Sequence, residues 1–223
     1  MIATLAPRFE KLPAAQRRLW STLRPVRDLG FVLYGGTAVS LHLGQRRSID
    51  FDFFHDRALD AAALRKAIPS LVTAQTLQQE ANTLVVSVGR RSPVKVSFFG
   101  GLTFGRIGDP VLTADGVAEV ASLEDLLAHK LKVILQRAEK KDYEDIAALL
   151  RTGVPLARGL AGARLLFGKT FQASESLKAL AYFKDGDLAR LGRAPRNALI
   201  AAAAGVRDLP DVTLRSRSLA IPV

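Results

Sequence analysis

The segment 48–54 reads Ser-Ile-Asp-Phe-Asp-Phe-Phe, so two aspartates alternate with apolar residues. A period of two is that of a β-strand, in which successive side chains point to opposite faces of a sheet. Asp50 and Asp52 are therefore predicted to share a face, with Cα atoms about 6.6 Å apart at a rise of roughly 3.3 Å per residue. Buried carboxylates are tolerated chiefly when they are paired or bind a metal. The segment is the first candidate for a functional site, with room for one divalent cation or a pair.

A pair of glycines, Gly35-Gly36, precedes this strand and separates two shorter elements. The apolar run 31–34 is predicted to be a buried strand, and residues 38–43 a short helix with Thr37 as its N-cap. Glycines at such a turn let a ligand approach the backbone, and the N–H groups at a helix start favour an anion. A plain tight turn that binds nothing explains the same pair, so the glycines alone leave both interpretations open.

The glycine turn and the Asp-x-Asp strand together are more specific than either alone. The turn would hold phosphate beside a divalent cation, which is what nucleotidyl transfer needs, because the metal bridges phosphate oxygens and offsets developing charge. Carboxylate oxygens are hard ligands, so Mg²⁺ is the expected ion. The combination indicates a site for an NTP as the substrate.

The pattern of elements changes near residue 120. Before it, apolar alternation and turn residues predict strands interleaved with helices, whereas Ser122 starts a helical pattern that continues to the end. We predict an α/β (α+β) fold with a mixed sheet in residues 1–120 and a helical C-terminal portion in residues 121–223. The boundary is soft, because a single core could cover both. The other expected elements are helices at 8–29 and 59–68 and strands at 49–54, 72–79, 83–88 and 94–99.

Composition sets broad limits on function. The chain has no cysteine, which excludes disulfides, zinc–thiolate sites and cysteine nucleophiles. No apolar run approaches the roughly 18 residues of a membrane span. The first residues show no basic and apolar leader of the signal-peptide kind. A cytoplasmic protein that does not use a membrane is therefore expected.

The net charge of +11 is uneven along the chain. Residues 1–48 hold eight Lys and Arg against two acids, residues 151–223 hold twelve against five, and residues 49–150 hold twelve against fourteen. A basic rim around an acidic centre suits a polyanion such as RNA. A generally Arg-rich composition explains the same distribution, so charge alone leaves nucleic-acid binding open.

Two blocks of residues resemble the AbiEii-type nucleotidyltransferase toxins, members of the DNA polymerase β-like nucleotidyltransferase superfamily. The first block is Tyr-Gly-Gly-Thr-Ala at 34–38, followed by Arg-Ser-Ile-Asp-Phe-Asp at 47–52. The Arg-x-Ser-x-Asp-x-Asp element is the sharpest match. The second joins His-Lys-Leu-Lys at 129–132 to Lys-Asp-Tyr-Glu-Asp at 141–145. The resemblance covers about residues 30–150 and implies the polymerase β-like fold.

The resemblance also implies roles for individual residues. Asp50 and Asp52 would bind the metal, Lys130 would support the nucleotide phosphates, and Asp142 would complete the catalytic site. The residues implied to contact the nucleotide are Gly35, Gly36, Thr37, Arg47 and Ser48. Family members are typically toxins paired with a separate antitoxin, and several transfer nucleotides to tRNA or related acceptors.

One position departs from the superfamily pattern. The strand at 94–99 is expected to carry a third carboxylate, but Ser97 occupies the position, with Lys95 on the same face. In a polymerase-like mechanism that acid is the base for the attacking hydroxyl. Its absence leaves three options open: a single-metal site, a different base such as Asp142 or His55, or loss of activity.

Several of these residues also have simpler explanations. The basic residues within 130–141 recur near one helix face and could form a solvated surface. Asp142 and Asp145 could be a helix N-cap and a first-turn acid that stabilise the helix dipole. Arg46 and Arg47 could bind phosphate or merely neutralise the two aspartates.

The expected function is Mg²⁺-dependent transfer of a nucleoside monophosphate from an NTP to a hydroxyl acceptor in RNA, such as tRNA, or in a protein. The protein would be the toxin of a toxin–antitoxin pair. The alternative is a degenerate, non-catalytic member of the fold that binds nucleotide or RNA and acts only as a toxin–antitoxin partner. Ser97 in place of an acid is the main support for that alternative.

Overall fold

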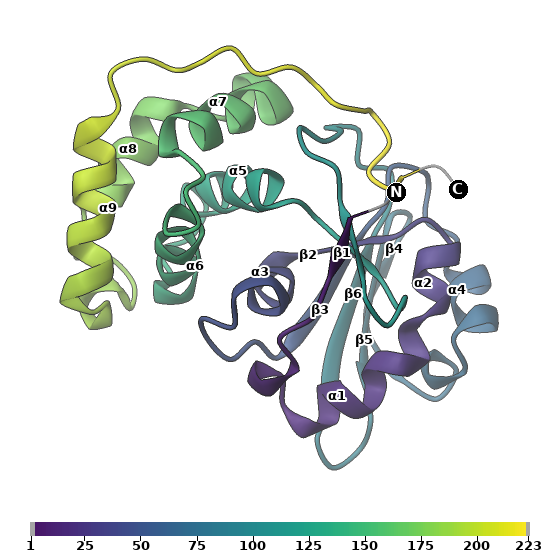
Figure 1. Cartoon of the computed structure of the whole chain (residues 1–223). Coiled ribbons are helices and arrows are strands. Elements are labelled where there is room, and N and C mark those ends of the chain that lie inside the picture. Colours follow the sequence, from purple (N-terminus) through teal and green to yellow (C-terminus); the bar gives the residue numbers. More distant parts are fainter. Residues whose placement is uncertain (1–2, 222–223) are drawn as a thin grey trace. The chain divides into compact units, whose positions relative to one another are not determined.

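The alternating apolar segments in the first part of the chain assemble into one eight-stranded sheet, in the order β1-β7-β8-β2-β3-β6-β5-β4 (Figure 1). Strand β3 runs antiparallel to β2 and parallel to β6, so the sheet is mixed, as predicted. The strands are β1 (Thr4–Leu5), β2 (Val32–Tyr34), β3 (Asp50–Phe54), β4 (Gln75–Glu80), β5 (Thr83–Val88), β6 (Val94–Phe99), β7 (Val111–Thr113) and β8 (Glu119–Val120).

The computed structural model describes residues 3–221, and these form two units. The sheet unit comprises residues 3–105, 109–122 and 216–221. The helical unit comprises residues 106–108 and 123–215. The chain therefore leaves the sheet unit after residue 122, builds the helices and returns.

The return segment is anchored in the sheet unit by an apolar and a polar contact. Leu219 is fully buried, and the backbone N–H of Ile221 donates to Oε2 of Glu119 in β8 at 3.1 Å. Glu119 is itself buried, so this N–H satisfies a carboxylate that water scarcely reaches.

The helix predicted at 8–29 is wrong as a single element. Pro13 is the N-cap of one helix and Pro25 the first residue of the next, because a proline has no N–H to continue a helix from the preceding turn. Asp60 caps a later helix, its side chain accepting from the N–H of Ala63 at 2.9 Å. The helical elements of the sheet unit are η1 (Phe9–Lys11), α1 (Ala14–Trp20), η2 (Ser21–Leu23), α2 (Pro25–Asp28), α3 (Gly35–Leu43), α4 (Ala61–Ala67) and η3 (Pro69–Leu71).

The two faces of β3 differ in character, and this difference places the candidate site. Phe51 and Phe53 are fully buried in the apolar core, where Phe53 stacks on Phe98 of β6 with ring centroids 5.5 Å apart. Asp50 and Asp52 occupy the alternate positions and are only partly buried. One face of the strand therefore supports the core, and the other presents carboxylates.

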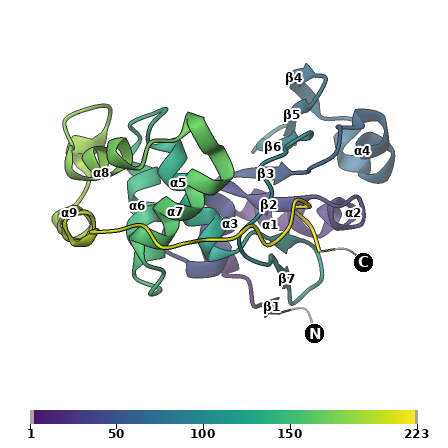
Figure 2. The same cartoon turned by 90° about the horizontal axis from the view of Figure 1, so that it is seen from above.

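The helical unit contains five α-helices within the described residues, drawn from teal to yellow in Figure 2. A Cβ atom on Gly159 would lie 2.5 Å from Leu127, so glycine is what lets α7 pack closely on α5. None of the helices described for the chain is long and apolar enough to cross a membrane. The elements are α5 (Leu123–Val133), α6 (Lys140–Leu150), α7 (Leu156–Phe167), η4 (Gly168–Thr170), α8 (Ala173–Ala181), η5 (Leu188–Arg190) and α9 (Arg193–Gly205).

Candidate functional site

The two aspartates of β3 share a face of the sheet, and strand pairing determines what lies beside them. In the parallel pairing of β3 with β6, Asp50 is opposite Lys95 and Asp52 is opposite Ser97. On the other side, Asp52 is opposite Tyr34, the last residue of β2. Because Gly35 follows Tyr34 directly, this register brings the glycine turn next to Asp52.

The glycine turn packs against the aspartate strand so closely that side chains are excluded from it. Gly35 has a left-handed backbone with φ +72°, and a Cβ atom there would lie 2.4 Å from Oδ2 of Asp52. A Cβ atom on Gly36 would lie 2.4 Å from a guanidinium nitrogen of Arg46 and 3.2 Å from Oγ of Ser48. Glycine is therefore required at position 35, by the backbone conformation and by the contact with Asp52, whereas at position 36 the flexible Arg46 side chain can move aside.

Helix α3 begins at Gly35, with Tyr34 as its N-cap residue, so the prediction of Thr37 as the N-cap is wrong. Thr37 is instead fully buried, and its hydroxyl donates to the backbone carbonyl of Asp50 and lies 2.9 Å from Oγ of Ser48. These bonds fasten the start of α3 to the residues that enter β3. Thr37 thus holds the glycine turn in place over the aspartates.

The structure places two neighbouring arginines differently. Arg47, the predicted nucleotide contact, is exposed, whereas the guanidinium of Arg46 lies against Gly36. One guanidinium nitrogen of Arg46 also donates to the carbonyl of Arg47 at 2.9 Å. The spacing Arg-x-Ser that precedes the aspartates is satisfied by Arg46 and Ser48, a signal present in the sequence that points to Arg46 as the arginine of the site.

The donor set on β3 fits a divalent ion whose coordination is completed by a substrate. Mg²⁺ in proteins is usually held by one or two carboxylates, with phosphates and water supplying the other oxygens. Asp50 and Asp52 provide two carboxylates, and the space that a Cβ atom of Gly35 would fill lies beside one of them. Within residues 3–221 no group of three or more acidic or histidine residues could enclose a metal, and buried Ser97 adds no charge. The residues present suit a site shared with a bound nucleotide.

The second predicted block forms a buried ion-pair cluster in the helical unit. Nζ of Lys130 in α5 lies 2.7 Å from a carboxylate oxygen of Asp142 and 2.7 Å from one of Asp145, both in α6. Their side chains are 6%, 0% and 0% exposed. Nε of Arg137, whose side chain is 46% exposed, donates to Asp142 at 2.8 Å. We call these four residues the Lys130 cluster.

The structure excludes a solvated basic face for Lys130 and the N-cap position for Asp142. Lys130 does not belong to a solvated basic face, because its charge is enclosed by two carboxylates. Asp142 lies in the first turn of α6, but the N-cap residue is Glu139. The sequence could not distinguish these cases, since burial depends on how α5 and α6 pack.

The environment of the Lys130 cluster shifts two pKa values. Burial by itself would raise the pKa of Asp142, but the hydrogen bond from Arg137 and the charge and hydrogen bond of Lys130 outweigh it and lower this pKa below its ordinary value. Desolvation by burial, assisted by the charge of Lys130, lowers the pKa of His129 to about 3. Asp142 is therefore ionised and His129 neutral at physiological pH.

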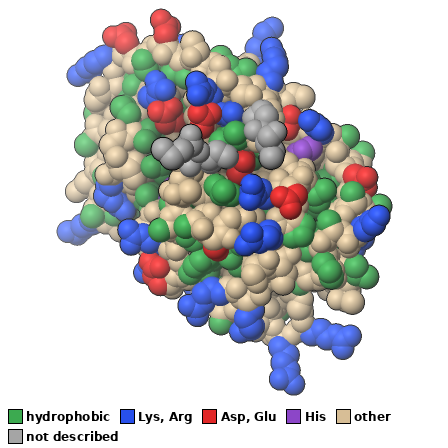
Figure 3. Space-filling view, turned by 45° about the vertical axis from the view of Figure 1, so that its right-hand side comes forward, with side chains coloured by type: hydrophobic (Ala, Val, Ile, Leu, Met, Phe, Trp, Pro, Cys, Tyr) green, Lys and Arg blue, Asp and Glu red, His purple; other side chains and the backbone are tan. Residues whose placement is uncertain are grey.

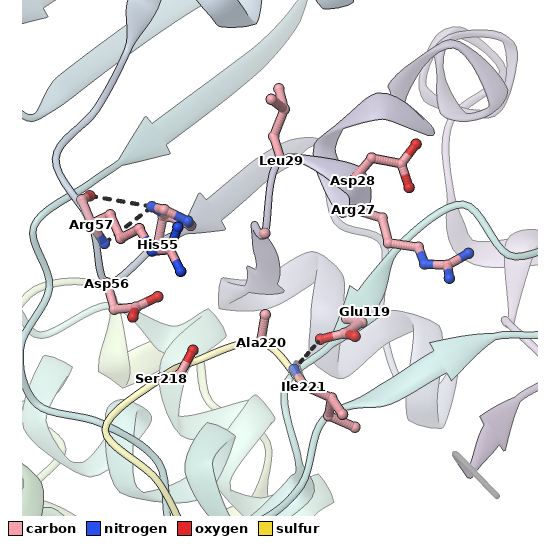
Figure 4. A pocket seen from close by; sticks show the side chains of 11 residues that line it. Arg27, Asp28, Leu29, His55, Asp56, Arg57, Glu119, Ser218, Ala220 and Ile221 are labelled. Carbon is pink, nitrogen blue, oxygen red and sulfur yellow. Dashed lines mark hydrogen bonds between the residues drawn. The ribbon is translucent and has the colours of Figure 1, made fainter. Parts of the chain in front are cut away.

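A separate pocket of about 230 Å³ lies at the other end of β3 (Figure 4). Its walls come from the loop after β3, the turn before β2, Glu119 and the return segment 218–221. His55 lies in this wall, and its Nδ1 accepts the N–H of Arg57 at 3.1 Å. His55 lies three positions after Asp52, about 10 Å along an extended chain at roughly 3.3 Å per residue. The structure thus assigns His55 to this pocket.

Basic side chains do not form one continuous surface on the face drawn in Figure 3, where Lys and Arg are scattered among acidic and hydrophobic groups. The sites predicted from sequence therefore fall into two sets: the glycine turn with its two aspartates in the sheet unit, and the Lys130 cluster in the helical unit.

Comparison with known proteins identifies the family to which the chain belongs. Residues 18–213 match the family model described as nucleotidyl transferase AbiEii toxin of type IV toxin–antitoxin systems. The chain belongs to the AbiEii family. Membership in this family confirms the resemblance seen in the motifs, and it implies a cognate antitoxin.

Individual proteins are similar to the chain over most of its length. An uncharacterized protein of Aquifex aeolicus (strain VF5), aq_aa25, is 32% identical over 149 residues, which cover 64% of this chain and 69% of that protein. The crystal structure of an antigenic nucleotidyltransferase-like protein from Paracoccidioides brasiliensis has a TM-score of 0.54 at 16% identity, covering 88% of this chain and 96% of that one. MenT4, a nucleotidyltransferase toxin of Mycobacterium tuberculosis H37Rv, has a TM-score of 0.54 at 12% identity, covering 86% and 83%. At these identities the structural neighbours confirm the nucleotidyltransferase fold that the motifs predicted.

Proposed function

We propose that this AbiEii-family protein is an active, Mg²⁺-dependent nucleotidyltransferase that moves a nucleoside monophosphate from an NTP to a hydroxyl of an RNA acceptor such as tRNA, as the toxin paired with an antitoxin in the cytoplasm. The observation that carries the proposal is the contact of the glycine turn with Asp52. At this contact the backbone leaves no room for a side chain and lies beside two carboxylates. A phosphate group needs such a close approach to the backbone, and its cation needs such ligands.

The sheet unit supplies the groups that would bind the triphosphate. The backbone at Gly35 and Gly36 would lie against phosphate oxygens at the start of α3. Ser48 and Arg46, which both approach Gly36, would donate to the same phosphates, while Thr37 keeps the turn in place. Arg47, exposed on the same loop, would contribute at longer range.

Asp50 and Asp52 would hold Mg²⁺, which would offset the negative charge of the phosphates during the reaction. In the transfer, the acceptor oxygen forms a bond to the α-phosphorus, the bond from that phosphorus to the bridging oxygen of the β-phosphate breaks, and pyrophosphate leaves. The hydroxyl proton would pass to a carboxylate of β3 or to water, because Ser97 provides no acid–base group in the usual pH range.

Within the helical unit, Arg137 is the member of the Lys130 cluster whose charge is most open to water. Lys130 is enclosed by Asp142 and Asp145, whereas nearly half of the Arg137 side chain is exposed. Asp142 would hold both Arg137 and Lys130 in place. Its lowered pKa makes it a weak proton acceptor, so we assign it to positioning rather than to base catalysis.

The test uses the purified full chain with Mg²⁺, total tRNA and each of the four labelled NTPs in turn. Label should appear in RNA with the wild type and disappear with Asp50→Ala. Asp208→Ala removes an exposed aspartate outside the site and is the matched control, expected to behave as the wild type. Label that persists in Asp50→Ala, or never appears with any nucleotide or acceptor, would overturn the proposal.

A second function has one specific observation in its favour. Ser97 stands opposite Asp52 in register, so the sheet offers no third carboxylate at that position. A non-catalytic protein that binds nucleotide or RNA as a toxin–antitoxin partner would need none. Binding of an NTP without transfer to any acceptor would favour this function over the first.

A further inference from the structure

The proposed function assigns no role to the positive charge of Lys95, which lies beside the two aspartates. Its Nζ lies 3.4 Å from Oδ2 of Asp50, and the two side chains are 45% and 34% exposed. A pair this open to water is worth little for stability, about 0–1 kcal/mol for typical surface pairs. Its place on the catalytic face of the sheet therefore calls for a functional explanation.

Strand register directs the charge of Lys95 towards the aspartates. In β6, Lys95 has Asp50 opposite it on β3 and the uncharged Ser87 opposite it on β5. The lysine side chain is a point charge on a flexible stem, so it can leave one oxygen and reach another without any movement of the sheet. A lysine at this position of the sheet and a divalent cation would compete for the carboxylate of Asp50.

We propose that Lys95 is a built-in cation of the active site, which occupies Asp50 until the nucleotide arrives with its metal and then transfers to the phosphates. The inference rests on the metal site of the proposed function. Because Lys95 is paired with Asp50 and Ser97 provides no third carboxylate, the site offers fewer acidic ligands than two divalent ions would need, and we expect one ion per chain.

The exchange gives Lys95 two opposite effects on binding. In the free protein, its positive charge repels a metal ion at Asp50 and lowers metal affinity. In the nucleotide complex, the same charge attracts the triphosphate and raises nucleotide affinity. If Lys95 merely supported the fold, its removal would change the metal affinity and the nucleotide affinity in the same direction. Changes of opposite sign in these two affinities therefore identify the exchange.

The experiment measures binding without turnover. Mn²⁺ binding to the nucleotide-free full chain is followed by electron paramagnetic resonance, and binding of a non-hydrolysable NTP analogue with Mg²⁺ by calorimetry. Lys95→Gln should bind Mn²⁺ about tenfold more tightly and the analogue about tenfold more weakly than the wild type, as expected for a charge a few ångströms away that is screened nearly as in bulk water. Lys95→Arg keeps the charge, and Lys66→Gln removes an exposed lysine of α4, so both should resemble the wild type.

The stoichiometry offers a second readout. Ser97→Asp adds a carboxylate opposite Asp52 and should raise bound Mn²⁺ in the analogue complex from one ion to two per chain. Two ions in the wild type would overturn the single-ion part of the inference.

The outcomes separate this inference from the proposed function. Lys95→Gln that leaves Mn²⁺ affinity within twofold of the wild type, or weakens both ligands, overturns the exchange. Loss of Mn²⁺ binding in Asp50→Asn, with Lys95→Gln unchanged, would leave the metal site standing and remove only the role of Lys95. Mn²⁺ binding that Asp50→Asn does not affect would remove the metal site itself.

Discussion

Both charged clusters of this protein pair a lysine with aspartate, but water reaches them to very different extents. The Lys95–Asp50 pair on the sheet has side chains 45% and 34% exposed at a separation of 3.4 Å. The Lys130 cluster has a lysine 6% exposed, with two fully buried aspartates at 2.7 Å. A pair open to water can exchange its partner for a ligand at little cost, whereas a buried pair cannot lose a member without leaving a charge uncompensated. The first is suited to binding and the second to holding helices together.

The largest effect should come from removing the buried cation. Lys130→Met leaves Asp142 and Asp145 without their shared lysine and should lower the free energy of unfolding by about 3–5 kcal/mol. Urea denaturation followed by circular dichroism measures the loss. If the variant lost less than about 1 kcal/mol, as exposed ion pairs do, the two clusters would not differ in the way that their burial indicates.

The next effect concerns the pH dependence of the helical unit. His129 stays neutral in the folded protein down to about pH 3, whereas in the unfolded chain it binds a proton near pH 6.5. Its contribution to stability is therefore complete above pH 6.5 and lost as the pH falls towards 3, by about 1.4 kcal/mol per pH unit.

Urea midpoints of the wild type and of His129→Phe, which cannot titrate, measure this contribution between pH 7 and pH 4. The wild type should show the steeper decline. Equal slopes would mean that the histidine is not enclosed beside Lys130.

A third prediction tests how closely the glycine turn approaches the aspartates. Gly35→Ala should destabilise the protein by about 2 kcal/mol, partly from the left-handed backbone at φ +72° and partly because its Cβ atom displaces Asp52. Gly153→Ala has a comparable backbone cost at φ +94° but no atom within 4 Å, so it isolates the backbone term. Thermal and urea unfolding of both variants give the difference, and equal losses would argue against a tight turn.

The smallest effect is expected at the exposed pair. Lys95→Met should change the free energy of unfolding by less than about 1 kcal/mol, because side-chain entropy and solvent screening offset most of the attraction. Urea denaturation at low and at high salt measures it. A loss comparable to that of Lys130→Met would show that Lys95 serves the fold, which would also count against its role as an exchangeable cation.

The sequence was most informative where structure is determined by neighbouring residues. The period-two pattern predicted β5 and β6 to the residue and β3 to within one, because alternation of side chains is a local property of a strand. Strands β1 and β7 were not predicted, since each has at most three residues and pairs with the other across more than a hundred positions. In the helix predicted at 8–29, the prolines override the apolar periodicity, because Pro13 and Pro25 cannot continue a helix from the preceding turn.

The same distinction applies to the site. The alternation within 48–54 indicated that Asp50 and Asp52 face the same way, and the motifs indicated the family. The 3.4 Å contact of Lys95 with Asp50 required the pairing of two strands that are distant along the chain. The burial of Lys130 required the packing of α5 on α6, which no local pattern contains. The role of Arg46 could be predicted from the sequence, because its spacing from Ser48 fits the Arg-x-Ser motif.

The return of residues 216–221 to the sheet unit has a consequence for biosynthesis. Glu119 and the core around Leu219 are completed by residues that leave the ribosome about a hundred positions later than β8. The whole helical unit is synthesised in between, so the sheet unit waits with an uncovered carboxylate and an unfilled apolar site until translation passes residue 221. For a member of a toxin family, this order of assembly delays the mature fold until nearly all of the chain described here has been made, and truncated products of the same gene would lack it.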